Sequence, residues 1–355
     1  MEFGISCSRL ADIDLVTSAE QWGYDFCWAT DSPLLRSNPW TILSLAAERT
    51  RRIRLGMGVA VPGLRLAPDT ASGIASVNYL APGRAFLGIG TGNTAMRTLG
   101  RPPMRVKPFA EYIRSVRGLL DGEEVALTDE SRTPRPARFQ NLDRGYINIE
   151  DRIPIYVGGF GPRAQALAGE LGDGLITGIP RGGTVDQALA HVERGAKRTD
   201  RALDAFHTTA LVNVLVLEPD EGLQSERVIN QIGSAVMANV HYLVERHKET
   251  GEDPPNYVLP IWEEYLGFHR TREAERQHQA LHASHYSFLD PEEARFVTPE
   301  MIDTFALVGR PEALCEKLET LERAGLNAIA FIPTDDEKWA VYEAFATSVI
   351  ARMRR

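Results

Sequence analysis

The segment PIYVGGFGPRAQALAGELGDGLIT (154–177) contains one complete strand–helix–strand unit. Its apolar run at 154–159 predicts a strand, the pattern at 163–171 predicts a helix, and DGLIT (173–177) predicts a second strand. Because both apolar runs are almost uninterrupted, we expect the two strands to be covered on both faces, as in a parallel sheet. The unit decides the fold class, since the rest of the chain repeats it.

Eight such apolar runs alternate with helical patterns along the chain. The predicted strands lie at 2–6, 26–30, 53–61, 84–90, 154–159, 173–177, 208–217 and 327–333. The predicted helices lie at 11–22, 40–48, 68–80, 109–120, 163–171, 185–198, 311–324 and 338–352. Eight parallel strands are the number that closes a barrel, so the prediction is an α/β protein with a (β/α)8 TIM barrel. A doubly wound open sheet is the competing topology.

The length of 355 residues exceeds the roughly 250 that eight strand–helix units need. The surplus falls between the seventh and eighth strands, where helices are expected at 221–249 and 260–285. We therefore expect one domain, 1–355, with a helical insertion at about 218–298. Long insertions on barrel loops commonly cover the active site.

Composition narrows the class of protein. The formal net charge of −9 argues against nucleic acid or an anionic membrane as the main partner. Three scattered cysteines without a CxxC motif argue against a disulfide framework or a thiolate zinc site. No apolar stretch reaches 18 residues, and the N-terminus lacks the pattern of a signal peptide. We expect a cytoplasmic, homo-oligomeric enzyme that acts on a small molecule.

Glycines are concentrated in LGIGTGNTAMRTLGRPP (87–103), directly after the fourth strand. Gly88, Gly90 and Gly92 allow the backbone to approach a flat or anionic ligand. A dinucleotide-binding motif is excluded, because the third glycine of GxGxxG is missing and the segment does not follow the first strand. The alternative is a glycine-rich turn without a ligand.

A second glycine segment, YVGGFGPRAQAL (156–167), predicts a phosphate site. Gly158 and Gly159 end a strand, and Gly161 with the following proline opens a helix. Unobstructed N–H groups at a helix N-terminus bind phosphate, and Arg163 adds a positive charge. A plain strand–turn–helix connection is the alternative, although it needs only one glycine.

Two other segments have both a functional and a structural interpretation. LGMGVAVPG (55–63) indicates a bulge or a close approach to a ligand, or else a packed strand of small residues. Asp31 and Ser32 follow the second strand, where catalytic side chains of a barrel lie, but Asp31 also suits the N-cap of a turn.

His282 and His285 are one helical turn apart in the insertion. Without a suitably spaced carboxylate they do not predict a metal site, and the alternatives are side chains that reach the substrate or a solvated helix face. The motifs of hydrolases and metalloproteases are missing from the sequence, so we expect a bound cofactor to supply the chemistry.

The sequence resembles the bacterial-luciferase-like superfamily of flavin- and F420-dependent oxidoreductases, in particular its methylenetetrahydromethanopterin-reductase-like branch. The two glycine segments carry the resemblance, together with VGRPEALCEKLETLERAGLNAIAFIP (308–333). The resemblance implies that FMN or coenzyme F420 binds at the C-terminal mouth of the barrel. It also implies a non-proline cis peptide between Gly58 and Val61.

The resemblance assigns roles to individual residues. The expected cofactor-binding residues are Gly58, Val59, Ala60, Gly90, Thr91, Gly92, Asn93, Gly158, Gly159, Phe160, Gly161, Arg163 and Thr177. The expected catalytic residues are Asp31, Ser32 and Asn93. Independently of the resemblance, the residues of the insertion suggest that Trp262, His282 and His285 reach the substrate.

One position departs from the pattern. F420-dependent dehydrogenases of this superfamily tend to carry Asp-His where this chain has Asp31–Ser32. The first expectation is therefore a two-component monooxygenase that uses O2 and reduced FMN supplied by a separate flavin reductase. The alternatives are an F420-dependent hydride-transfer reductase or dehydrogenase, and a non-catalytic flavin-binding protein.

Overall fold

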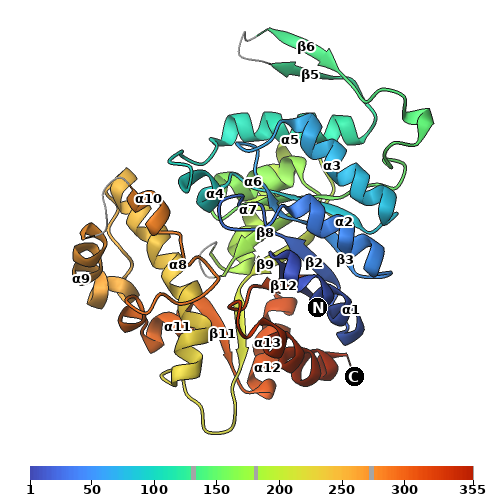
Figure 1. Ribbon diagram of the computed structural model, residues 1–355. Helices are drawn as coiled ribbons and strands as arrows, with labels where there is room; N and C mark the ends of the chain where they lie inside the picture. The colour runs from blue at the N-terminus through green and yellow to red at the C-terminus, as the bar shows by residue number, and fades with distance from the viewer. Residues whose placement is uncertain (129–132, 180–182, 272–275, 355) are drawn as a thin grey trace.

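In a computed structural model of the chain, which describes residues 1–128, 133–179, 183–271 and 276–354, eight strands form a closed barrel (Figure 1). The strands are β1 (Glu2–Cys7), β2 (Phe26–Ala29), β3 (Arg54–Ala60), β4 (Ala85–Ile89), β7 (Ile155–Gly158), β8 (Gly174–Gly178), β9 (His207–Leu211) and β12 (Ala328–Phe331). Every neighbouring pair is parallel, and the strands follow one another around the ring in chain order. The predicted TIM barrel is confirmed, and the open sheet is excluded.

Helices surround the barrel. They are α1 (Ile13–Trp22), α2 (Pro39–Arg49), α3 (Ala67–Leu80), α4 (Asn93–Arg97), α5 (Val106–Leu120), α6 (Pro162–Leu171), α7 (Val185–Arg198), α12 (Pro311–Arg323), α13 (Lys338–Phe345) and α14 (Ala351–Met353). The bounds of α7 match the prediction because Thr184 and Gln187 form a capping box at its start. The last predicted helix is divided, since a π-helical turn at Ala346–Ile350 separates α13 from α14.

The inside of the barrel is closed by large side chains. Phe26, Trp28, Phe86, Tyr156 and Ile176 form one buried cluster there. The ring centroids of Trp28 and Phe86 are 4.5 Å apart. The inside of the barrel is therefore a packed core, and a ligand has room only beyond this cluster of side chains, at an end of the barrel.

The seventh predicted strand, 208–217, proves to be two strands. Its first half is β9, whereas Asn213–Val216 forms β10 and pairs in parallel with β11 (Ala306–Gly309) outside the barrel. An apolar run shows that a segment is buried but not which sheet covers it, so periodicity did not reveal the break.

The residues between β10 and β11, 217–305, form the insertion, which lies beside the barrel in Figure 1. Its helices are α8 (Glu226–Thr250), α9 (Leu259–Arg270), α10 (Gln277–Ala280) and α11 (Pro299–Phe305). The helix predicted at 221–249 is confirmed as α8. The one predicted at 260–285 is wrong as a single helix, because α9 ends at Arg270; residues 272–275 lie outside the described part of the chain.

A feature that the sequence did not predict is the antiparallel pair β5 (Val125–Thr128) and β6 (Pro134–Ala137). This hairpin stands away from the barrel at the top of Figure 1. None of the described helices is both long and apolar enough to cross a membrane.

Candidate active site

A cavity of about 1430 Å³ lies at the carboxyl ends of the barrel strands, between the barrel and the insertion. Barrel enzymes carry their active sites at this end. The volume exceeds the roughly 300–1,000 Å³ of a typical small-molecule site, which leaves room for a cofactor together with a substrate. The predicted residues that line it are Asp31, Ser32, Gly58, Val59, Gly90, Thr91, Gly92, Asn93, Gly158, Phe160, Gly161, Arg163, His282 and His285.

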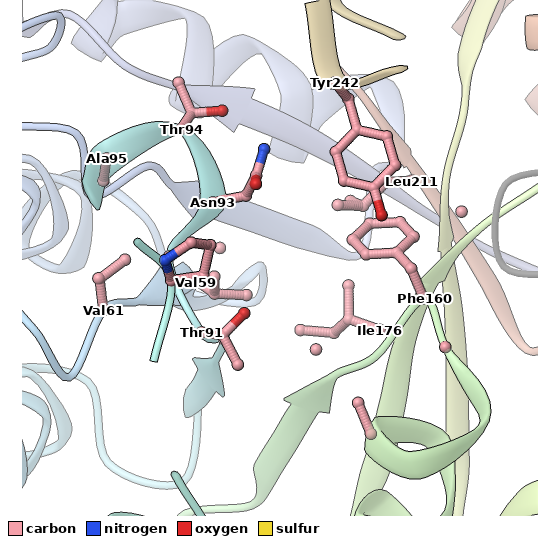
Figure 2. A pocket seen from close by; sticks show the side chains of 18 of the residues that line it. Val59, Val61, Thr91, Asn93, Thr94, Ala95, Phe160, Ile176, Leu211 and Tyr242 are labelled. Carbon is pink, nitrogen blue, oxygen red and sulfur yellow. The ribbon is translucent and has the colours of Figure 1, made fainter. Parts of the chain in front are cut away.

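One wall of the cavity is a bulge at the end of β3. The Gly58–Val59 peptide is cis, as the resemblance implied, and the register against β4 shifts between Met57 and Ala60. A Cβ on Gly90 would lie 2.6 Å from Cγ2 of Val59, so these strands approach closely only because residue 90 is glycine. Figure 2 shows Val59 on one side of the cavity, with Ile176 of β8 on the other.

Asp31 stabilises this wall from the β2–α2 loop. Its Oδ2 pairs with Arg65 and accepts the backbone N–H of Val61 at 3.3 Å. Burial raises the pKa of the Asp31 carboxyl above its usual range, and Arg65 and the Val61 N–H offset part of the rise. The carboxylate makes no N-cap bond to the following turn among the described contacts, so its partners favour a role in fixing the end of β3.

Helix α4 connects the cavity to the insertion. Arg97 donates through Nε to Oδ1 of Asn93 at 2.8 Å and forms ion pairs with Glu245 at 2.8 Å and Glu249 at 2.7 Å. Both glutamates lie on α8. Nε2 of His282 lies 3.1 Å from Oε1 of Glu245, so one buried carboxylate joins α4, α8 and the segment after α10.

The opposite end of the cavity is formed by the N-terminus of α6. Gly161 is the N-cap residue, no side chain caps the helix, and a Cβ on Gly161 would meet nothing within 4 Å. The first N–H groups of a helix have no intrahelical acceptor, and the helix dipole favours an anion beside them. This arrangement supports the predicted phosphate site and places the exposed Arg163 next to it.

Four further cations line the cavity, and sequence reasoning missed them. They are Arg105 and Lys107 at the start of α5, and Arg194 and Arg198 at the end of α7. Arg198 also pairs with Glu170 at 2.7 Å. No local motif marks this group, because its members come from helices that meet only in the fold.

Four predicted site residues do not line the cavity. Ala60 and Thr177 alternate with Val59 and Ile176 along their strands and are buried away from it, since neighbouring strand residues face opposite sides. Gly159 is needed for packing instead, because a Cβ there would lie 2.9 Å from the backbone of α6. Trp262 is buried within the insertion beside His247, with ring centroids 5.6 Å apart.

The two histidines predicted from the insertion both reach the cavity. Nε2 of His285 lies 3.1 Å from Oγ1 of Thr94, which follows Asn93 at the start of α4. Across the described residues, no group of three or more His, Cys, Asp or Glu side chains has the arrangement of a metal site.

Comparison with known proteins identifies the family. The model of the luciferase-like monooxygenase family matches residues 11–328. A 5,10-methylenetetrahydromethanopterin reductase from Archaeoglobus fulgidus is 29% identical over 347 residues, which cover 96% of this chain and 94% of the relative. An F420-dependent glucose-6-phosphate dehydrogenase from Beutenbergia cavernae is 33% identical over 56% of this chain and 62% of its own.

Solved structures agree with the barrel. The F420-dependent tetrahydromethanopterin reductase from Methanopyrus kandleri superposes with a TM-score of 0.72 at 23% identity, over 99% of both chains. A monooxygenase from Streptomyces bottropensis gives 0.59 at 18% identity over 99% of both chains. At these identities the likeness establishes the fold alone. With the family match spanning most of its length, this chain belongs to the luciferase-like monooxygenase family and is an oxidoreductase.

Proposed function

We propose that this protein is an F420-dependent oxidoreductase that transfers a hydride between the coenzyme and a small organic substrate. The observation that carries the proposal is the set of five cations that line the cavity: Arg105, Lys107, Arg163, Arg194 and Arg198. The sequence alone placed FMN first and F420 second. The full-length relatives support the reverse order, since they are reductases, whereas the monooxygenases are distant neighbours in fold.

The number of cations that line the cavity supports F420 over FMN. The side chain of FMN ends in one phosphate monoester, which the N-terminus of α6 and Arg163 suffice to bind. The side chain of F420 continues beyond its phosphate into a series of carboxylates. Arg105, Lys107, Arg194 and Arg198 would be superfluous for FMN, but they suit carboxylates that extend along the rim of the cavity.

The rest of the cavity fits a tricyclic ring. Val59 offers a flat apolar wall, and Gly90 keeps the neighbouring strand close to it. When bound, the coenzyme supplies a ring carbon that gives or accepts a hydride. Asp31 fixes the wall through Val61, and the insertion reduces the access of water to the reacting atoms.

A comparison of the two cofactors tests the proposal. Titration of the purified protein, followed by fluorescence quenching, is expected to give a Kd for F420 at least about ten-fold below that for FMN, a difference of about 1.4 kcal/mol. The Arg194→Gln/Arg198→Gln double variant is expected to weaken F420 binding about 2- to 30-fold and to leave FMN binding unchanged. The range assumes about 0.2–1 kcal/mol for each exposed ion pair.

Lys197→Gln is the matched control, since Lys197 is an exposed cation on the same helix that does not line the cavity. This variant should bind both cofactors as the unmodified protein does. The proposal would be refuted, and the monooxygenase favoured, if FMN bound more tightly than F420 and the double variant left both Kd values unchanged.

A further inference from the structure

The segment 284–287 of the insertion is held against the barrel in one conformation. Arg36 donates to the backbone oxygen of His285 at 2.6 Å, and the N–H of Asp335 donates to the oxygen of Ser287 at 2.8 Å. Tyr286 between them has a φ of 56°, in the left-handed region that aromatic residues rarely adopt. Tertiary contacts therefore impose this turn, and both His285 and Tyr286 line the cavity.

The imidazole of His285 is paired with a hydroxyl at the cavity. Its Nε2 lies 3.1 Å from Oγ1 of Thr94, and both side chains belong to the lining. Figure 2 shows Thr94 and Asn93 at the same edge of the cavity, above Thr91. The hydroxyl of Thr94 and the imidazole of His285 therefore lie next to one another, beside the expected position of the cofactor ring.

Several titratable and charged groups lie around His285. Its ring centroid is 5.7 Å from that of His282 and 4.7 Å from that of Tyr286. Behind His282 lies Glu245, which also pairs with Arg97. On the backbone side, Arg36 lies 3.8 Å from a carboxylate oxygen of Asp335, so the two charges there compensate one another.

Each carboxylate that lines the cavity within the described residues takes part in an ion pair, although Oδ1 of Asp31 has no hydrogen-bond partner there. Asp31 pairs with Arg65, Glu170 with Arg198, and Glu249 with Arg97. The mouth of β2 carries a serine, Ser32, which does not exchange a proton near neutral pH. Histidine is the side chain that does so, and His285 is placed where a substrate would contact its hydroxyl partner.

We propose that Thr94 and His285 form the proton-transfer pair of this enzyme and that its substrates are neutral carbonyl compounds or the corresponding alcohols. The inference rests on the proposed function, which supplies reduced deazaflavin as the hydride donor. It goes further by naming the residues that move the proton and the class of substrate that needs them.

The step balances in atoms and electrons. Reduced F420 would supply the hydride and be oxidised by two electrons, with His285 protonated at the start. The hydride added to the carbonyl carbon breaks the C=O π bond and leaves its electron pair on oxygen. That oxygen takes the proton of the Thr94 hydroxyl, while the proton on Nε2 of His285 passes to Oγ1 of Thr94. The substrate leaves as an alcohol, the imidazole is neutral, and solvent restores its proton.

The substrate class follows from this proton. A cationic C=N⁺ group becomes neutral when it accepts a hydride, so it needs no acid. A neutral carbonyl group instead becomes an alkoxide, and a positioned acid accelerates such a step by about 10²–10⁴-fold. A hydroxyl–histidine pair at the cavity therefore favours the neutral class.

Stopped-flow measurement of F420 oxidation tests the pair. Reduced F420 bound to the protein is mixed with acetone, cyclohexanone or benzaldehyde between pH 5 and 9. We expect the rate to fall as pH rises through the titration of one group. His285→Gln and Thr94→Val are expected to lower the rate at least about 10²-fold and to remove this pH dependence. Thr94→Ser keeps the hydroxyl and should restore most of the rate together with its pH profile.

His278→Gln, which changes an insertion histidine outside the cavity lining, should leave rate and profile unchanged. A second measurement needs no substrate: NMR titration of ¹³C-labelled histidines, with the His285 signal assigned by its loss in His285→Gln. This signal is expected to shift in Thr94→Val and on binding F420.

The outcomes separate this inference from the proposed function. If F420 does not bind, the proposed function fails and the inference falls with it. If F420 binds but none of the three carbonyl compounds is reduced, the substrate class is overturned. If His285→Gln reduces these compounds as fast as the unmodified protein does, with the same pH profile, the proton-transfer pair is overturned and the proposed function stands.

Discussion

The ion pairs of Arg97 predict how firmly the insertion is held on the barrel. The Arg97→Met substitution keeps most of the apolar stem and removes the guanidinium. The guanidinium forms ion pairs with Glu245 at 2.8 Å and with Glu249 at 2.7 Å. The two partners differ in environment, because the side chain of Glu245 is 9% exposed and that of Glu249 is 46% exposed.

The size of the effect follows from this difference. An exposed pair contributes about 0.2–1 kcal/mol, which sets the share of Glu249. Removal of one partner from a buried pair costs about 3–5 kcal/mol, because a buried charge is left uncompensated. His282 remains 3.1 Å from Glu245 and reduces that cost. We therefore expect Arg97→Met to weaken the docking of the insertion by about 2–4 kcal/mol, mostly through Glu245.

Two double-mutant cycles measure the shares separately. Arg97→Met is combined with Glu245→Gln in one cycle and with Glu249→Gln in the other, and hydrogen exchange of the amides in α8 gives the opening free energy. We expect a coupling above about 1 kcal/mol for Glu245 and below it for Glu249. Arg114→Met, on the exposed face of α5, is the control. A coupling to Glu249 that equals or exceeds that to Glu245 would refute the reasoning from burial.

Four further predictions concern the wall of the cavity, the N-terminus of α6 and the dependence of docking on pH. Gly90→Ala should destabilise the protein by about 1–3 kcal/mol in urea unfolding, since its Cβ would lie 2.6 Å from Cγ2 of Val59, and adding Val59→Ala should restore much of the loss. Gly161→Asp should weaken cofactor binding without loss of stability, because the added carboxylate suits an N-cap but repels phosphate. Gly159→Ala should instead lower the thermal midpoint, because its Cβ would meet the α6 backbone at 2.9 Å. The hydrogen bond from Arg97 holds the pKa of Glu249 below its usual value of 4.5. The contribution of the Arg97–Glu249 pair to docking of the insertion should therefore be complete above pH 4.5 and disappear as pH falls further. Hydrogen exchange should show this loss in the unmodified protein but not in Glu249→Gln.

The candidate site was predictable where it depends on the backbone. Gly90 and Gly161 line the cavity as expected, because a glycine at a strand end or a helix start marks a close approach in the sequence itself. Thr177 does not line the cavity, because a strand residue faces one side or the other according to register, which the apolar run 173–177 does not reveal. The partner of Asp31 was not predictable either, since Arg65 meets it only through the β2–β3 pairing.

By itself, the sequence determined the eight strands, the helices between them and the position of the insertion, because hydrophobic periodicity and capping act over neighbouring residues. It also determined which turns can approach a ligand. Only the tertiary structure decided which charges meet. Arg97 and Glu249 are 152 positions apart, and the cations that line the cavity come from the start of α5, from α6 and from α7. The physical reason is that ion pairs and hydrogen bonds depend on distances of a few ångströms, which closure of the barrel creates and local patterns do not record.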